Sequence, residues 1–209
     1  MGKTAEGSAS DEAEPSGGER RPDGVGKTAE GSASDEAEPS GGEDERGQRY
    51  GLIVGRFCPP HLGHSHMIEA AARQVDRLVV MVNTRDGEPV PGGLRAAWLA
   101  GLHPSVSVVE VHHDLPTDFD DQELWERWMA LFRAHWPFED GPEVVFSSEP
   151  YGDEIARRFG ATAIAVDPTR ATVPISATLV RERPLEHLHF LAPPVRAWVE
   201  AQARGASSA

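Results

Sequence analysis

Residues 55–64 read GRFCPPHLGH, and this stretch decides how the rest of the chain is interpreted. An apolar run, 50–54, precedes it, and a helical pattern over 67–75 follows it. A strand, a tight turn and a helix in this order aim backbone amides and the positive end of the helix dipole at one point. Gly55 keeps that point free of a side chain, and two prolines stiffen the turn. The stretch therefore predicts an anion site at the carboxyl end of a strand.

His61 and His64 lie three residues apart, one just before the predicted helix and one in its first turn. Both imidazoles can face the same anion and donate hydrogen bonds to its oxygens. Two other interpretations stay open. A zinc site would need further ligands, of which only His66 is nearby, and the two histidines could simply be packing residues. We favour the anion site and expect no metal held by the chain's own side chains.

A second polar pattern, residues 174–181, reads PISATLVR. Its proline predicts an extended approach, Ser176 is a natural N-cap, and Thr178 and Arg181 share one face of the helix that follows. Taken alone, this pattern is a capped helix with a surface arginine. Taken with residues 55–64, it is typical of the second half of a nucleoside triphosphate site.

Strand-like and helix-like segments alternate along most of the chain. Short β-branched runs of nearly continuous apolar character occur at 50–55, 77–82, 106–111, 143–147 and 162–166. Helical patterns lie between and after them at 64–74, 93–101, 121–135 and 151–159. Strands that are apolar along their whole length suit a sheet buried on both faces. The order predicts an α/β fold, a Rossmann-like doubly wound parallel sheet, whose ligands bind at the carboxyl ends of the strands.

The first 48 residues cannot build a core of their own. They contain no aromatic residue and only two apolar residues larger than alanine. Residues 2–19 recur letter for letter as 26–43, and the repeat has no apolar face that could stack. We predict a disordered acidic tail with this internal duplication over 1–48, a folded domain over 49–203 and a flexible C-terminus over 204–209.

Composition limits the partners of the chain. The net charge is -14, and residues 1–49 hold 13 acidic against 6 basic side chains. An acidic chain repels nucleic acid at long range, so we expect small-molecule partners and no nucleic acid. The single cysteine, Cys58, fits a cytoplasmic protein and is expected to pack rather than react. The sequence has no run of 18 apolar residues, so no membrane partner is expected.

Lysine usage excludes several mechanisms. The only lysines, Lys3 and Lys27, lie in the predicted tail. A phosphate-loop lysine and a lysine Schiff base are therefore excluded in the predicted domain. Gly26-Lys27-Thr28 looks like the end of a phosphate-binding loop, but Arg21 stands where the opening glycine should be, and no apolar strand precedes it.

The two motifs together resemble those of the nucleotidylyltransferase superfamily. More narrowly, residues 50–200 resemble the nicotinamide mononucleotide adenylyltransferases, both the archaeal enzymes and the bacterial NadR type. The supporting stretches are 146–152, 166–170, 181–184 and 193–196. The chain differs from the bifunctional bacterial relatives because it has neither their kinase domain nor a helix-turn-helix pattern. The resemblance implies a stand-alone transferase.

The resemblance also implies roles for individual residues. By position, the nucleotide would be bound by Gly55, Arg56, Phe57, His61, His64, Ser176, Thr178 and Arg181. Of these, His61, His64 and Arg181 would be catalytic. An acceptor phosphate oxygen would attack the α-phosphate in line and release pyrophosphate, which needs positioning and charge stabilisation but no enzyme nucleophile. Mg²⁺ is expected with the nucleotide, held largely by its phosphates.

The acceptor side is less defined. Asn83, Trp125 and Arg170 are candidates for base or acceptor contacts, with Trp125 stacking on a cationic nicotinamide ring. Trp125 could equally belong, with Trp128 and Phe132, to an apolar helix face. Transfer of AMP from ATP to nicotinamide mononucleotide is the favoured reaction. Transfer of CMP to a small phosphonate such as phosphonoformate, and a nucleotide sensor without turnover, remain alternatives, as does assembly into a homo-oligomer.

Overall fold

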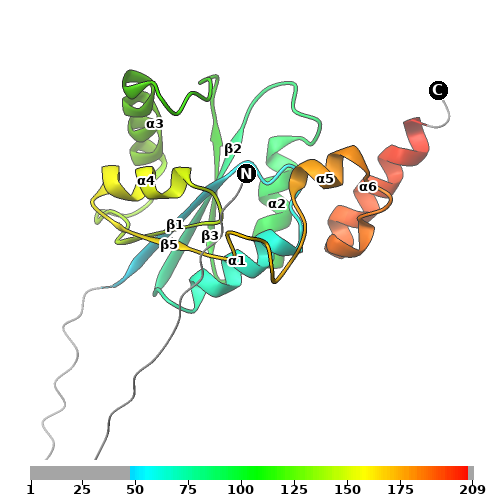
Figure 1. The fold of residues 1–209 in the computed structure, drawn as a ribbon, viewed down its shortest axis with the longest axis horizontal. Helices are drawn as coiled ribbons and strands as arrows, with labels where there is room; N and C mark the ends of the chain where they lie inside the picture. The colour runs from blue at the N-terminus through cyan, green and yellow to red at the C-terminus, as the bar shows by residue number, and fades with distance from the viewer. Residues whose placement is uncertain (1–47, 207–209) are drawn as a thin grey trace, which may run out of the picture. The chain divides into compact units, whose positions relative to one another are not determined.

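A computed structural model describes residues 48–206 of the chain (Figure 1). The five strands are β1 (Tyr50–Gly55), β2 (Arg77–Thr84), β3 (Ser107–His112), β4 (Val144–Ser147) and β5 (Thr162–Ala165). The helices are α1 (Leu62–Ala72), α2 (Gly92–Leu102), α3 (Gln122–His135), α4 (Tyr151–Phe159), α5 (Ala177–Glu182), the short 3-10 helix η1 (Leu188–Phe190) and α6 (Pro193–Ala206). The predicted tail lies outside the described residues except for Gln48, as do residues 207–209 of the predicted C-terminus.

The strands form one parallel sheet in the order β3-β2-β1-β4-β5. β1 lies at its centre, where Leu52 pairs with Val79 of β2 on one side and with Val145 of β4 on the other. The chain first builds the sheet outward through β2 and β3, and then returns to the other side of β1 with β4. This order confirms the predicted Rossmann-like fold, and it creates a switch point between the carboxyl ends of β1 and β4.

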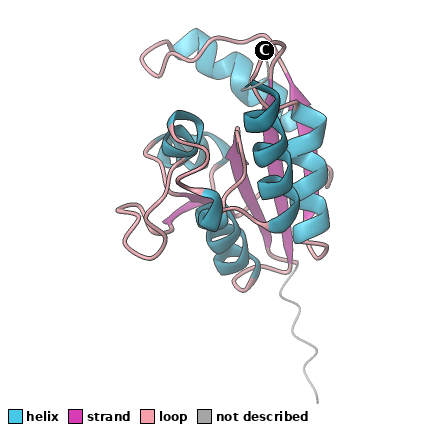
Figure 2. Ribbon diagram, turned by 90° about the vertical axis from the view of Figure 1, so that its right-hand side faces the viewer, coloured by secondary structure: helices cyan, strands magenta, loops and turns pink. Residues whose placement is uncertain are grey.

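Helices cover both faces of the sheet, as the continuous apolar character of the strands predicts (Figures 1 and 2). Alternate residues of each strand point to opposite faces. On one face, Ile53 belongs to a core cluster with residues of α1 and α2. On the other face, Leu52 and Val54 belong to a second cluster with residues of α3 and α4. This double packing fixes where the end of each strand lies.

A third core cluster lies outside these two layers. It joins Cys58 in the loop after β1, Trp98 of α2, Ile175 and Val180 around α5, and the apolar side of α6. Sequence reasoning did not predict α6, which reaches Ala206 and therefore makes residues 204–206 helical. No helix among residues 48–206 has the length and apolar character needed to cross a membrane.

Candidate active site

The switch point opens into a cavity of ≈ 550 Å³. Gly55 at the end of β1 and Ser147 at the end of β4 both line it. The eleven residues predicted for the site also line it, although they come from distant parts of the chain: Gly55, Arg56, Phe57, His61, His64, Asn83, Trp125, Arg170, Ser176, Thr178 and Arg181. The fold therefore brings both motifs and the predicted acceptor residues to one place.

The two motif histidines form a stacked pair. Their ring centroids are 3.7 Å apart, and the ring planes differ by 20°. His61 precedes the first residue of α1, and its backbone N–H donates to Nδ1 of His64 over 3.2 Å. Because that Nδ1 accepts, neutral His64 carries its proton on Nε2, which is left as a donor.

Burial keeps both imidazoles uncharged. Desolvation, together with the nearby Arg170 charge, lowers the pKa of His61 to about 4. Desolvation is also the largest cause of the lowered pKa of His64, followed by the charges of His61 and Arg170. At neutral pH the pair therefore offers N–H donors without placing two positive charges side by side.

The ring geometry argues against a zinc site at this pair. The nitrogen lone pairs of two stacked rings lie in nearly parallel planes, so they do not converge on one ion. In the part of the chain that the structure describes, no three His, Cys, Asp or Glu side chains cluster as metal ligands would. Nδ1 of His61 is buried and has no hydrogen-bond partner among the residues that the structure describes.

Phe57 and Gly63 hold the histidines in place. The Phe57 ring is buried and packs edge-on against His64, with centroids 4.8 Å apart. A Cβ at Gly63 would lie 3.1 Å from Nδ1 of His61, so any side chain there would push the ring aside. A Cβ at Gly55 would meet the Phe57 ring at 3.1 Å. Gly55 thus makes room for the Phe57 ring. The sequence predicts a different role, in which the missing side chain leaves space for a ligand.

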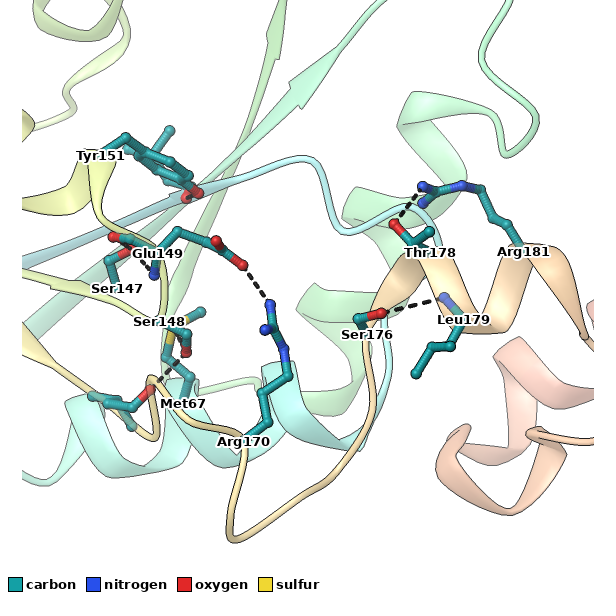
Figure 3. A network of polar contacts seen from close by, with 12 residues as sticks. Met67, Ser147, Ser148, Glu149, Tyr151, Arg170, Ser176, Thr178, Leu179 and Arg181 are labelled. Carbon is teal, nitrogen blue, oxygen red and sulfur yellow. Dashed lines mark hydrogen bonds and ion pairs between the residues drawn. The ribbon is translucent and has the colours of Figure 1, made fainter. Parts of the chain in front are cut away.

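The second motif closes directly on the first. Ser176 caps α5 by accepting the backbone N–H of Leu179, as predicted, and Arg181 donates to Oγ1 of Thr178 over 3.1 Å (Figure 3). Arg181 also donates to the backbone carbonyl of Cys58 over 2.6 Å. Cys58 itself is a buried free cysteine, in agreement with the packing role expected for it. One guanidinium therefore ties the two motifs together at the edge of the cavity.

The loop between β5 and α5 is shaped by Asp167. Its carboxylate accepts the backbone N–H groups of Ala171, Thr172 and Val173 at 2.8 to 3.2 Å. Burial alone would raise the pKa of Asp167, but these hydrogen bonds lower it overall. Within residues 48–206, the non-glycine residues with positive φ are Phe57, Asp167 and Arg170, and all three line the cavity. Strained backbone thus gathers at this site, as it does at functional sites generally.

Arg170 lies on the nucleotide-motif side of the cavity. Its charge lowers the pKa of both His61 and His64, and it follows β5, at the opposite end of the sheet from β3. Its side chain forms an ion pair with Glu149 (Figure 3). The predicted acceptor contact of Arg170 stays untested, and its position groups it with the phosphate-binding motifs.

The other two predicted acceptor residues, Asn83 and Trp125, come from β2 and α3. Asn83 is at the end of β2, and its Oδ1 is buried without a partner. Trp125 of α3 belongs to the second core cluster, as the apolar-face interpretation predicts, and it also lines the cavity, while its contact with an acceptor stays a prediction. Its indole N–H donates to the carbonyl of Phe119, and the Arg158 guanidinium lies 5.3 Å from its ring. A protein cation thus already contacts Trp125.

Several cavity residues were not assigned by sequence reasoning. They follow the ends of strands and comprise Arg85, His113, Thr117, Asp118, Phe119, Glu149, Tyr151 and Asp167. The signal that could have found them is their place after β2, β3, β4 and β5, because loops at the carboxyl edge of a parallel sheet converge on the ligand.

Known proteins of similar sequence are enzymes of nicotinamide nucleotide metabolism. The chain is 26% identical over 163 residues to the trifunctional NAD biosynthesis/regulator protein NadR of Escherichia coli, covering 68% of this chain but only 38% of NadR. It is 28% identical over 117 residues to a nicotinamide-nucleotide adenylyltransferase of Methanothrix thermoacetophila, covering 54% of this chain and 65% of that protein. The predicted resemblance to both groups is confirmed.

Solved structures agree with the sequence comparison. A structure of a NadR protein in complex with NR has a TM-score of 0.54 at 25% identity, covering 69% of this chain and 43% of that one. The matched part of this chain thus spans less than half the length of its NadR relatives. Residues 52–183, from the centre of the sheet through both motifs, match the family described as cytidylyltransferase-like, and the chain belongs to that family.

Proposed function

We propose that this protein transfers AMP from ATP to nicotinamide mononucleotide, forming NAD and releasing pyrophosphate. The observation that carries the proposal is the meeting of both phosphate-binding motifs on one cavity, where Arg181 of the second motif donates to the Cys58 carbonyl of the first. The relatives named above include nicotinamide-nucleotide adenylyltransferases, which supports this choice of nucleotide and acceptor.

In this reaction a phosphate oxygen of the acceptor attacks the α-phosphorus of ATP. The bond from that phosphorus to the bridging oxygen of the β-phosphate breaks, and pyrophosphate leaves with the bonding electrons. The chain's contribution is to position both substrates and to stabilise negative charge on the leaving group. His61 and His64 supply neutral N–H donors, the first turn of α1 supplies backbone amides, and Arg181 supplies a fixed positive charge.

Mg²⁺ would be bound mainly by the triphosphate, where it neutralises phosphate charge. Three carboxylates line the cavity: Glu149 is paired with Arg170, Asp167 accepts backbone N–H groups, and Asp118 accepts the backbone N–H of Asp120. The described residues hold no group of three such side chains placed as metal ligands, which fits an ion carried by the substrate. We also propose that the reaction takes place in the cytoplasm. Its substrates are small molecules, and a reducing compartment keeps a single cysteine reduced.

The acceptor half of the cavity suits a flat aromatic ring. Its wall contains Phe119, Trp125, Trp128 and Phe132. The buried Oδ1 of Asn83 and Nδ1 of His113, on neighbouring strand ends, have no hydrogen-bond partner within residues 48–206. A nicotinamide ring could stack on this wall and offer its carboxamide to such groups, whereas a small phosphonate would leave most of the wall without contact.

The test is pyrophosphate release from the purified protein with Mg²⁺. ATP and CTP are each combined with nicotinamide mononucleotide, nicotinate mononucleotide and phosphonoformate, and the products are identified by mass. We expect release with ATP and nicotinamide mononucleotide, with NAD as product. Release only with CTP and phosphonoformate would replace both the base and the acceptor of the proposal. Nucleotide binding without release in any pairing would indicate a sensor.

A further inference from the structure

One ion pair bridges two walls of the cavity. Glu149 lies on the turn between β4 and α4, and Arg170 lies on the loop after β5, and their side chains point toward one another (Figure 3). The two side chains are 44% and 41% exposed, so water reaches the pair. Both residues line the cavity. The pair is therefore accessible to a ligand that enters the site.

Arg170 is placed where a polyphosphate would compete for it. Its charge acts on both motif histidines. Asp167 shapes the backbone on either side of Arg170, because its carboxylate accepts the N–H of Ala171 while its carbonyl accepts that of Arg170. The arginine is thus presented to the phosphate side of the cavity by an ordered loop, and Glu149 is the carboxylate with which it pairs there.

Glu149 has room to move away. A second cavity of ≈ 320 Å³ lies beside the first, and both cavities are lined by Ser147, Ser148, Glu149 and Arg170. The ion pair stands where these two cavities meet. The second cavity thus leaves space beside the Glu149 side chain.

We infer that Glu149 is an internal competitor for Arg170, and that Arg170 leaves it for the phosphates of the bound nucleoside triphosphate. The inference rests on the proposed function for the identity of that ligand. Exposed ion pairs are weak, so the triphosphate can replace the carboxylate at small cost. A ligand that brings little negative charge to Arg170 would not displace Glu149 from it. Glu149 thereby lowers the affinity for nucleotides by a small factor.

The experiment measures ATP binding by calorimetry, with Mg²⁺ and without an acceptor, so that no turnover occurs. Four proteins form a double-mutant cycle: wild type, Glu149→Gln, Arg170→Gln and the double variant. Glu149→Gln should tighten ATP binding by about two- to fivefold, because Arg170 no longer has a competing partner. Arg170→Gln should weaken binding, and adding Glu149→Gln to it should change nothing further.

If Glu149 acted only by repelling the phosphates through space, the double-mutant cycle would give a different result. In that case Glu149→Gln would tighten binding by the same factor with or without Arg170, and the inference would be wrong. An unchanged ATP affinity in Glu149→Gln would overturn it as well. Glu149→Ala repeats the measurement with a different replacement, and thermal unfolding verifies that each variant is folded.

Glu186→Gln is the matched control. Glu186 pairs with Arg183 at an exposed position, and neither residue lines either cavity. Its ATP affinity should equal that of wild type, and a gain like that of Glu149→Gln would overturn the inference by pointing to net charge alone. A protein that shows the full binding pattern but releases no pyrophosphate would contradict the proposed function and leave this inference standing.

Discussion

At the residue scale, the chemistry depends on two histidines that stay neutral. The pKa of His61 is lowered to about 4 by burial and by Arg170, whereas an unfolded histidine titrates near 6.5. Between these values the unfolded chain binds the extra proton and the folded chain does not. The free energy of unfolding must therefore fall as the pH falls through this window, and the contribution is fully present above it.

This linkage is measurable by urea unfolding at pH 7.5 and pH 5. We expect wild type to lose roughly 1–2 kcal/mol more than His61→Gln over this interval, because glutamine does not titrate. Equal losses in the two proteins would show that His61 is not held neutral in the folded state. In the same window, kcat/KM should show no inflection from His61 near its ordinary pKa.

A donor at position 64 should matter more for turnover than for binding. His64→Ala removes the Nε2–H donor and should lower kcat roughly 100-fold, the usual effect of losing one preorganised donor. His64→Gln keeps an N–H donor and should recover part of that loss. His66→Gln, two residues along the same helix but outside the cavity lining, should remain close to wild type. Steady-state kinetics with ATP varied separates kcat from KM for each variant.

At the element scale, the turn from β4 into α4 depends on close packing at Gly152. A Cβ there would lie 2.3 Å from Cβ of Ser147, so the turn that carries Glu149 must shift. We expect Gly152→Ala to lower the free energy of unfolding by about 1–3 kcal/mol and to reduce activity as well.

Gly101→Ala is the matched control for this turn. Gly101 is near the end of α2, and a Cβ there meets no atom within 4 Å. The substitution should raise stability by about 0.5–1 kcal/mol, because alanine is the better helix former. Urea unfolding of both variants checks the pair, and a stable Gly152→Ala protein would contradict the packing argument.

Most elements could be predicted from local patterns. β1 and α4 have the predicted bounds, and the remaining predicted strands and helices differ by at most two residues at an end. β2 continues through Asn83 and Thr84 because they pair with β3, and no local apolar pattern reveals this pairing. α6 was not predicted because it starts with two prolines and has few apolar positions, although proline is well tolerated in a first helical turn.

The candidate site was predictable only where motifs marked it. Both motifs were recognisable because their residue types and spacing are unusual together. Arg85 and His113 belong to neither motif, and they join the cavity only because β2 lies next to β1 and β3 lies next to β2 in the sheet. Strand order arises from packing between distant segments, so local patterns place these residues at the ends of strands but do not show that they reach the cavity.

At the scale of the whole molecule, α6 supports the site although it lies outside the segment that matches the family. The third core cluster joins Val195 of α6 to Cys58 of the first motif and Ile175 of the second. Val195→Ala should lower stability by roughly 1–3 kcal/mol and raise the KM for ATP, because the cavity it leaves loosens both motifs.

A comparison with another buried valine isolates this effect. Val79→Ala removes an equally buried side chain from β2, which belongs to the second cluster and not the third. Its stability loss should be similar, with little change in the KM for ATP. If both variants raise that KM equally, general destabilisation rather than support of the motifs explains the effect.

The central position of β1 has a consequence for how the chain is made. Its pairing of Gly51 with Val144 joins segments separated by more than half of the described residues. During synthesis β1 can pair with β2 early, and β3 can then add to β2, but the other edge of β1 has no partner until β4 has left the ribosome. An unpaired strand edge that is apolar on both faces can pair with the wrong segment or with another chain. Pairing across long stretches of chain is also slow. The strand that ends in the first phosphate motif is therefore the one that newly made chains must protect for longest.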